Sequence, residues 1–206
     1  PMGGNVIVDI MTDVCYQRQD CTALIDHTDR ADRALSATNM GSVYASATNI
    51  DSNYRITANA EFAAMFTPWY QMTCPATATT NAMPASYVYL VSLGRSIKNN
   101  PNWLAIAGAS RGVVQNAIAP NTTKTLTEAI ANTYEPRNGI AINPICNIKP
   151  YGYLIWGNRT LKNNAIEGNL TATSFLNTRN MVSDIKKLAY TVAKRLMFEQ
   201  NNEILW

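Results

Sequence analysis

Two short apolar runs and one long helical pattern constrain the fold of this chain more than any other feature. The runs GIAINPI (139–145) and YLIW (153–156) have the length of strands, and glycines lie at the start of the first and on both sides of the second. A long helical pattern follows at about 176–199. Helices that interleave with short, mostly apolar strands are typical of mixed α/β or α+β bodies.

The rest of the sequence continues the alternation of helices and short strands. Further helices are expected at 5–18, 29–39, 84–98 and 125–134. Further strands are expected at 22–26, 43–47, 62–66 and 113–119. Turns or loops are expected at 67–70, 73–84, 108–112 and 161–174. The predicted fold class is therefore α+β, a mixed sheet of short strands flanked by helices, with a long C-terminal helix.

The long helix has two distinct faces when its residues are placed at about 100° intervals. One broad apolar face, expected to be core, is formed by Met181, Val182, Ile185, Leu188, Ala189, Val192, Ala193 and Leu196. A basic stripe beside it is formed by Arg179, Lys186, Lys187 and Lys194. The stripe is either a solvated flank or a docking surface for an acidic partner, and the sequence leaves both interpretations open.

Composition and charge limit the partners of the chain. Hydrophobic residues make up 47% and charged residues 15%, which predicts a folded body. The net charge of +3 is too small to indicate a nucleic-acid binder. Residues 1–33 carry six acids and three bases, whereas the remainder carries eight acids and fourteen bases, so complementary surfaces between copies are expected. No stretch reaches the roughly 18 apolar residues of a membrane span, and no membrane partner is expected.

The sequence contains few of the residues that catalysis or metal binding requires. The single histidine, His27, lies in a predicted loop with Asp26 and Asp29 nearby, and a lone loop histidine rarely gathers a ligand set. No G-x-S-x-G elbow and no glycine-rich phosphate motif is present. We therefore expect no catalytic, cofactor-binding or metal site, no cofactor, and no enzymatic activity.

The four cysteines are scattered and form neither a C-x-x-C pair nor a zinc spacing. They are Cys15, Cys21, Cys74 and Cys146. In a chain of this length, such cysteines are typical of reduced thiols that fill the core of a protein made in a cytosol.

Several segments resemble, in the right order, the sheath proteins of contractile phage (myovirus) tails. The similar segments in the second half are WLAIAGASRG (103–112), GIAINPI (139–145), GYLIWGNRTL (152–161), FLNTRNMVSDIKK (175–187) and FEQNNEILW (198–206). Ile106, Asn180 and Gln200 depart from that pattern, where a proline, an arginine and a proline are usual. RQDCTALID (18–26) and FAAMFTPWY (62–70) resemble the family more weakly. The divergent details suggest a distant member, such as one from a giant phage.

The resemblance implies a structural subunit that stacks in six-fold rings around an inner tail tube. The rings contract to drive the tube through the host envelope during delivery of DNA or effectors. The implied partners are other sheath subunits, the tail tube and the baseplate. The implied location is the virion, after synthesis in the host cytoplasm. The alternative, from a different class, is a phage-associated hydrolase or adhesin domain, for which one histidine leaves few catalytic combinations.

The resemblance also divides the chain into an α/β lobe at 1–135 and a conserved-type inner sheath region at 136–206. Pro1 precedes Met2 and the sequence stops at Trp206, so both ends look cut and the connecting C-terminal arm of the family is expected to be missing. We therefore expect a fragment that is monomeric in isolation.

Residue roles follow from the same motifs. The expected structural framework is Gly139, Asn143, Pro144, Gly152, Trp156, Gly157 and Thr160. Arg159 follows a Trp-Gly turn, where a buried or interfacial bidentate contact is expected. The hypothesised interaction residues are Arg159, Arg179, Lys186, Lys187 and Lys194, with the lysines facing an acidic tube or a neighbouring subunit.

Overall fold

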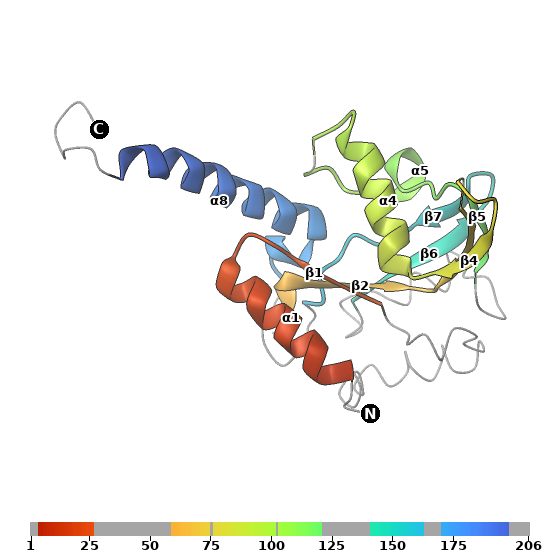
Figure 1. Ribbon diagram of the computed structural model, residues 1–206, viewed down its shortest axis with the longest axis horizontal. Helices are drawn as coiled ribbons and strands as arrows, with labels where there is room; N and C mark the ends of the chain where they lie inside the picture. The colour runs from red at the N-terminus through yellow and green to blue at the C-terminus, as the bar shows by residue number, and fades with distance from the viewer. Residues whose placement is uncertain are drawn as a thin grey trace.

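The computed structural model describes residues 4–26, 59–74, 76–101, 103–120, 141–162 and 170–197, and Figure 1 shows their arrangement. The elements in chain order are α1 (Gly4–Arg18), β1 (Ala23–Asp26), η2 (Ala60–Phe62), β2 (Ala63–Thr67), β3 (Tyr70–Thr73), β4 (Thr80–Met83), α4 (Ala85–Ile97), α5 (Gly108–Arg111), β5 (Ala117–Pro120), β6 (Ile142–Ile148), β7 (Gly152–Ile155), η5 (Ala172–Ser174) and α8 (Leu176–Leu196). The predicted α+β class with a long C-terminal helix is confirmed.

The strongly apolar or periodic elements lie close to their expected positions. The confirmed helices are α1, α4 and α8, and the confirmed strands are β1, β2, β6 and β7. The expected strand at 113–119 is only partly correct, because β5 covers 117–120 and Val113 forms an isolated bridge to Leu154. The expected elements at 29–39, 43–47 and 125–134 lie outside the described residues.

Two expected loops are wrong in part because they contain strands of a second sheet. β3 begins within the expected turn at 67–70, and β4 lies within the expected loop at 73–84. β4 is exposed or half-buried along its whole length. Its sequence TNAM therefore does not alternate between apolar and polar residues, which is the pattern that indicates a half-buried strand. The expected turn at 108–112 contains the short helix α5, and the expected loop at 161–174 contains η5 near its end.

The larger sheet has four strands in the order β1-β2-β6-β7. β1, β2 and β6 run parallel, and β7 pairs with β6 in the antiparallel direction. β2 lies inside the sheet and is buried along its whole length, as expected for a strand covered on both faces. The strands come from both sides of the proposed boundary at 135/136, and the division into two lobes remains a prediction.

Alternate residues of β2 divide the core into two layers. Ala63 and Met65 pack in a cluster with Cys15 of α1, whereas Ala64 and Phe66 pack in a second cluster with α4. This alternation follows from the two-residue period of a strand. Figure 1 shows the result, with α1 on one side of the sheet and α4 on the other. The ring of Phe66 stacks on that of Tyr89 with centroids 4.5 Å apart.

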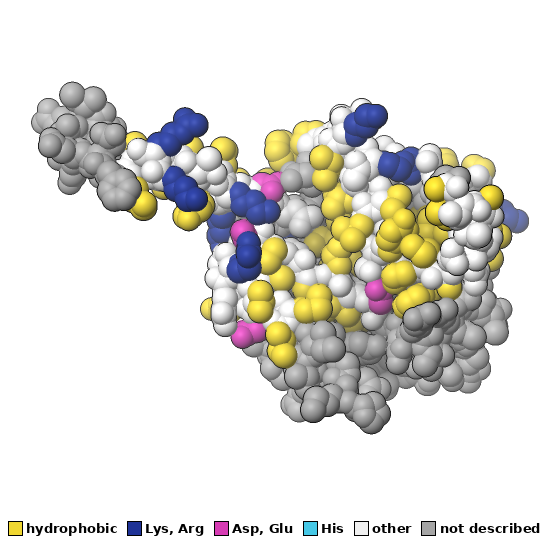
Figure 2. All heavy atoms as spheres, in the orientation of Figure 1, with side chains coloured by type: hydrophobic (Ala, Val, Ile, Leu, Met, Phe, Trp, Pro, Cys, Tyr) yellow, Lys and Arg dark blue, Asp and Glu magenta, His cyan; other side chains and the backbone are white. Residues whose placement is uncertain are grey.

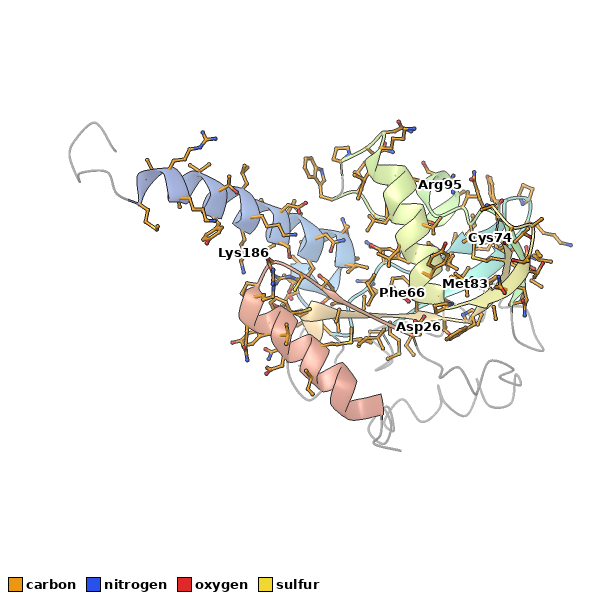
Figure 3. All side chains as sticks on the ribbon, viewed as in Figure 1. Asp26, Phe66, Cys74, Met83, Arg95 and Lys186 are labelled. Carbon is orange, nitrogen blue, oxygen red and sulfur yellow. The ribbon has the colours of Figure 1, made fainter. Side chains whose placement is uncertain are left out.

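The start of α4 is tied to the end of β1 by a carboxylate. Asp26 Oδ1 accepts a hydrogen bond of 2.9 Å from the backbone N–H of Ser86, and Oδ2 accepts one of 2.7 Å from Ser86 Oγ. Figure 3 shows Asp26 close to the beginning of α4. A carboxylate at the first turn of a helix satisfies free N–H groups there and complements the helix dipole. Burial raises the pKa of Asp26, although the hydrogen bonds from Ser86 oppose the increase.

The second sheet has three antiparallel strands in the order β4-β3-β5. It is joined to the first through Tyr70, which is completely buried. The Tyr70 hydroxyl donates a hydrogen bond of 3.0 Å to the carbonyl of Ile145 in β6, and its ring meets that of Tyr153 edge to face. This contact satisfies the one polar group of an otherwise apolar side chain.

Asn143 of β6 forms a buried hydrogen-bonding centre. Its Nδ2 donates to the carbonyl of Met65 at 3.1 Å and to that of Arg159 at 2.8 Å, and its Oδ1 accepts from the backbone N–H of Arg159 at 2.7 Å. The side chain is fully buried. The backbone of Gly157 lies so close that an added Cβ would come within 2.7 Å of Asn143 Cα. The expectation that Asn143 and Gly157 belong to the structural framework thus has a direct physical basis.

We predict that Asn143→Ala lowers the free energy of unfolding by about 3 kcal/mol, because buried backbone groups would lose their hydrogen-bond partners. The measurement is chemical denaturation. Asn147→Ala is the matched control, since Asn147 is half-buried further along the same strand, and we expect a loss below about 1 kcal/mol there. A loss below about 1 kcal/mol for Asn143→Ala would contradict the role given to this amide.

A second prediction concerns the pH dependence of Asp26. Because the folded protein raises the pKa of Asp26 above its usual 3.8, the contribution of this group to stability is lost as the pH rises through the raised pKa. Asn at this position keeps an oxygen acceptor and carries no charge. The melting temperature of Asp26→Asn relative to the unmodified protein should therefore increase from about pH 4 to pH 7. A difference that stays constant or decreases over this range would refute the assignment.

Candidate functional site

The first residues of the long helix α8 are held to the body of the molecule by hydrogen bonds, and the rest of the helix projects from it. The backbone N–H of Leu176 donates to the carbonyl of Asn158 at 3.1 Å, and Asn158 Nδ2 donates to Asn177 Oδ1 at 2.6 Å. Arg159 and Phe175 form an isolated antiparallel bridge. These contacts attach the start of α8 to the segment that follows β7.

Arg159 makes contacts within the chain at the base of α8. Its guanidinium lies over the ring of Phe175, with Cζ 4.0 Å from the ring centroid. Its backbone is held by Asn143, and the side chain is half-buried. In the described part of the chain, Arg159 is therefore a cation–π partner at the base of α8, and no bidentate ion pair of this residue is seen there.

Arg179 was expected in the exposed basic stripe, and that expectation is wrong. Its side chain is buried, with the residue 2% exposed, and the guanidinium lies 3.9 Å from the centroid of the Phe62 ring. Its Nη1 lies 3.4 Å from Glu61 Oε1. Burial lowers the pKa of Arg179, and the charge of Glu61 opposes that decrease. The first two turns of α8 rest on the body, so the helix face that carries Arg179 is covered there.

The Glu61 carboxylate contacts side chains from several segments at the base of α8. Lys162 Nζ lies 3.6 Å from its Oε2, and Thr173 Oγ1 donates to the same oxygen. Arg179 Nη2 also contacts the carbonyl of Gln19 at 3.5 Å. One carboxylate therefore links η2, the segment before α8 and α8 itself, and Gln19 extends the network to the end of α1.

The apolar face of α8 points away from the body. The residues of the helix that are buried are Leu176, Arg179 and Ser183. At about 100° per residue, five other apolar residues of the helix lie roughly opposite to these three. We call them the outward stripe, and their exposed fractions are Met181 36%, Ile185 57%, Leu188 67%, Val192 51% and Leu196 45%. Figures 1 and 2 show α8 projecting from the body with hydrophobic and basic side chains along it.

The expected core face of this helix is thus wrong for this chain. Val182 is half-buried, and Ala189 and Ala193 are exposed like the outward stripe. Helical periodicity identified the apolar face correctly, but it carries no information on what covers that face. A continuous row of exposed apolar side chains on a projecting helix is typical of an interaction surface.

The three lysines of the predicted stripe lie in different surroundings. Lys186 donates a hydrogen bond to Gln19 Oε1, and Figure 3 shows it where α8 passes the end of α1. Lys187 lies at the wall of a groove, and Lys194 Nζ lies 4.6 Å from the ring centroid of Tyr190. Lys187 and Lys194 therefore remain candidates for contact with a partner, whereas Lys186 already contacts α1.

The groove beside Lys187 has a volume of about 250 Å³ and runs between α4 and the base of α8. Its α4 wall is apolar and includes Leu90, Leu93 and Ile97. Its opposite wall is polar and includes Asp184 and Lys187. This groove could not be predicted from the sequence, because its two walls are about 90 residues apart in the chain.

Most of the remaining framework residues have close contacts within the chain. The Trp156 side chain packs against the core cluster that contains Met65, and its backbone N–H donates to the carbonyl of Pro144 at 2.8 Å. Thr160 Oγ1 donates to the carbonyl of Thr173 at 3.1 Å. Gly152 has a φ of +82°, which favours glycine. Gly139 lies outside the described residues.

Gly112 is a framework residue that was not predicted from the sequence. A Cβ added to Gly112 would come within 2.7 Å of the carbonyl oxygen of Ile155, so β7 approaches this glycine closely. Gly112 ends the GASRG segment and lies next to a predicted strand, and a glycine at such a position can indicate a close approach of another backbone segment.

The described residues show neither a metal-ligand group nor a membrane-spanning helix. No cluster of three or more His, Cys, Asp or Glu is found among them, and His27 lies outside them. Within the same ranges, no helix has the length and apolarity to cross a membrane. The four cysteines are free thiols, with Cys15 and Cys146 buried and the other two half-buried.

Comparison with solved structures identifies the fold. The chain is similar to a chain of the contracted sheath complex of an extracellular contractile injection system, PVC, with a TM-score of 0.70 and 19% identity, over 98% of this chain and 48% of that one. It is similar to a chain of the contracted helical sheath of the anti-feeding prophage (AFP), with a TM-score of 0.63 and 15% identity, over 98% and 46%. A chain of the contracted AFP baseplate gives a TM-score of 0.67 and 17% identity, over 98% and 46%.

These similarities concern the fold. The chain spans about half the length of the structures that it matches. No family model matches the sequence, and no curated protein sequence matches it. The chain therefore has the fold found in the sheath and baseplate assemblies of contractile injection systems.

We predict that the outward stripe contributes little to the stability of the chain itself. Leu188→Glu should change the free energy of unfolding by less than about 0.5 kcal/mol, because the side chain is already in water. Leu176→Ala, at the buried base of the same helix, should cost about 2–4 kcal/mol. Denaturant titration of both variants is the measurement, and a large loss for Leu188→Glu would show that the stripe packs on the chain's own body.

Proposed function

We propose that this chain is a structural part of a contractile tail sheath, in which the outward stripe of α8 packs against another sheath segment. The similarity to sheath assemblies supports the class of function. The outward stripe is the observation that carries the proposal, because it is an apolar surface that the chain itself leaves in water.

The outward stripe can contribute to the free energy of assembly. Fully burying an exposed Leu, Ile, Val or Met side chain contributes about 1.5–3 kcal/mol. The five side chains of the stripe are 36–67% exposed, so each would gain roughly half of that amount on complete burial. Part of this gain is offset by the entropy of association. Repetition of the same contact around a ring and along a stack multiplies the remainder, which suits a sheath better than a transient complex.

The basic residues of α8 favour a partner with an acidic surface. Lys187, Lys194 and Arg195 lie on exposed parts of α8 or along the groove at its base, so an acidic surface on the tail tube or on a neighbouring subunit is the complement we propose. Arg159 and Arg179 are occupied within the chain and are no longer proposed as partner contacts. Lys186 is kept only as a secondary candidate.

The full proposal includes the larger assembly. The subunit stacks in six-fold rings around the tail tube, meets the baseplate, and contracts during delivery of DNA or effectors as part of a virion or related particle. Synthesis in the host cytoplasm, the structural, non-enzymatic role, and the monomeric state of the isolated 206-residue chain remain predictions. The similarity to sheath assemblies favours this function over a hydrolase or adhesin domain.

The proposal predicts that charges placed in the outward stripe abolish sheath assembly. We expect Leu188→Glu with Val192→Glu, in the complete gene product produced together with its tube protein, to yield bare tubes in negative-stain electron microscopy. Thr191→Glu is the matched control, since it lies on the same helix, is exposed, and is outside the stripe. Sheathed tubes with the double variant would refute the proposed contact.

Charge reversal tests the electrostatic part separately. Lys187→Glu with Lys194→Glu should weaken assembly most at low salt, because exposed charge pairs are screened as ionic strength rises. Sedimentation of assembled sheath across a salt series is the measurement. Unchanged yield and unchanged salt dependence would exclude an acidic partner for these lysines.

A further inference from the structure

Two cysteine sulfurs lie in contact at the junction of α1 and β1. Cys15 is in the last turn of α1, and Cys21 lies just before β1. The Cys21 thiol is 3.4 Å from the Cys15 sulfur. Cys15 is 8% exposed, and Cys21 is half-buried. The spacing of six residues matches no metal or redox motif, so only the fold brings these thiols together.

The backbone between the two cysteines explains their proximity. Gln19 has a φ of 64°, which reverses the chain after the helix, and its N–H donates to the carbonyl of Cys15 at 2.9 Å. A disulfide needs an S–S distance of about 2.05 Å, so the sulfurs must approach by roughly 1.4 Å from their present 3.4 Å. A rotation about the side-chain bonds of the half-buried Cys21 is the simplest way to achieve this.

A covalent link at this point would change how α1 is held. Among the described side chains of this helix, those of Thr12 and Cys15 are buried, whereas Ile10, Met11 and Val14 are at least 40% exposed. Tyr16 adds an edge-to-face contact with Phe62. Within residues 10–18, the part of α1 whose side chains are described, the helix therefore rests on the sheet through few residues, and one of them is Cys15 of the thiol pair.

We propose that Cys15 and Cys21 are an oxidisable thiol pair that closes to a disulfide in the presence of a low-molecular-weight disulfide such as oxidised glutathione, and thereby ties α1 to the start of β1. The inference rests on the contact between the sulfurs and does not depend on the proposed function.

The reaction balances as two successive exchanges. The Cys21 thiolate attacks one sulfur of oxidised glutathione, which breaks its S–S bond, forms a mixed disulfide and releases one glutathione thiolate. The Cys15 sulfur then attacks the Cys21 sulfur, forms the protein disulfide and releases the second thiolate. The two protons lost by the cysteines are taken up by the two released thiolates, so two protein thiols are oxidised and one glutathione disulfide is reduced.

The surroundings assign the order of the two steps. Cys21 lines the groove of about 250 Å³ at the base of α8, which gives a small disulfide access to its sulfur. Burial, together with the nearby Cys21, raises the pKa of Cys15 to about 12. Cys15 is therefore the second nucleophile, and its step is expected to be the slower one.

The test uses the full 206-residue chain, incubated with oxidised glutathione and digested with trypsin without reduction. Arg18 lies between the two cysteines, so cleavage separates the peptide that ends at Arg18 from the peptide 19–30, each with one cysteine. Mass spectrometry should find these peptides joined and find them released by dithiothreitol. Backbone hydrogen exchange of α1 should slow at least threefold in the oxidised protein.

Two variants keep the result interpretable. Cys21→Ser should abolish the joined peptides and leave α1 exchange unchanged by oxidation. Cys74→Ser is the matched control, because Cys74 lies in the turn after β3, and it should leave both readouts intact. The proposal is overturned if Cys21 only retains glutathione, if neither thiol is consumed, or if the link forms without any slowing of exchange in α1.

Discussion

The side-chain amide of Asn143 connects three parts of the molecule that are distant in sequence. It bonds to β2 through the carbonyl of Met65 and to the segment after β7 through both backbone groups of Arg159. An amide has enough donors and acceptors to satisfy all three groups at once, which an apolar residue of the same size cannot do. The close approach of Gly157 is what allows this segment to reach the amide.

The direction of α8 follows from that buried centre. Arg159, held by Asn143, pairs with Phe175 through both its backbone and its guanidinium, and Phe175 immediately precedes the helix. Arg179 then fixes the first turns of α8 on Phe62 and Glu61. The base of α8 thus packs on the body through the face that carries Leu176, Arg179 and Ser183, and the outward stripe remains exposed. The hydrogen bonds of Asn143 in the sheet therefore help to determine the position of the outward stripe of α8.

Sequence reasoning recovered the parts of the fold that are specified locally. The apolar strands β2 and β6 and the periodic helix α8 were placed to within a few residues. Asn143 and Gly157, which were expected in the framework, lie in close contact with each other. The predictions failed where tertiary contacts determine strand pairing or burial. β4 is too polar for its pairing to be visible, Arg179 is buried by residues more than 100 positions away, and the apolar face of α8 looks the same in sequence whether it is core or interface.

The outward stripe is the proposed interface between sheath segments. Cryo-electron microscopy of assembled particles, at a resolution that shows side chains, would reveal what covers this face of α8. We expect Ile185, Leu188 and Val192 to be buried against a neighbouring sheath segment in the assembled sheath. A sheath in which this face of α8 remains exposed to solvent would contradict it.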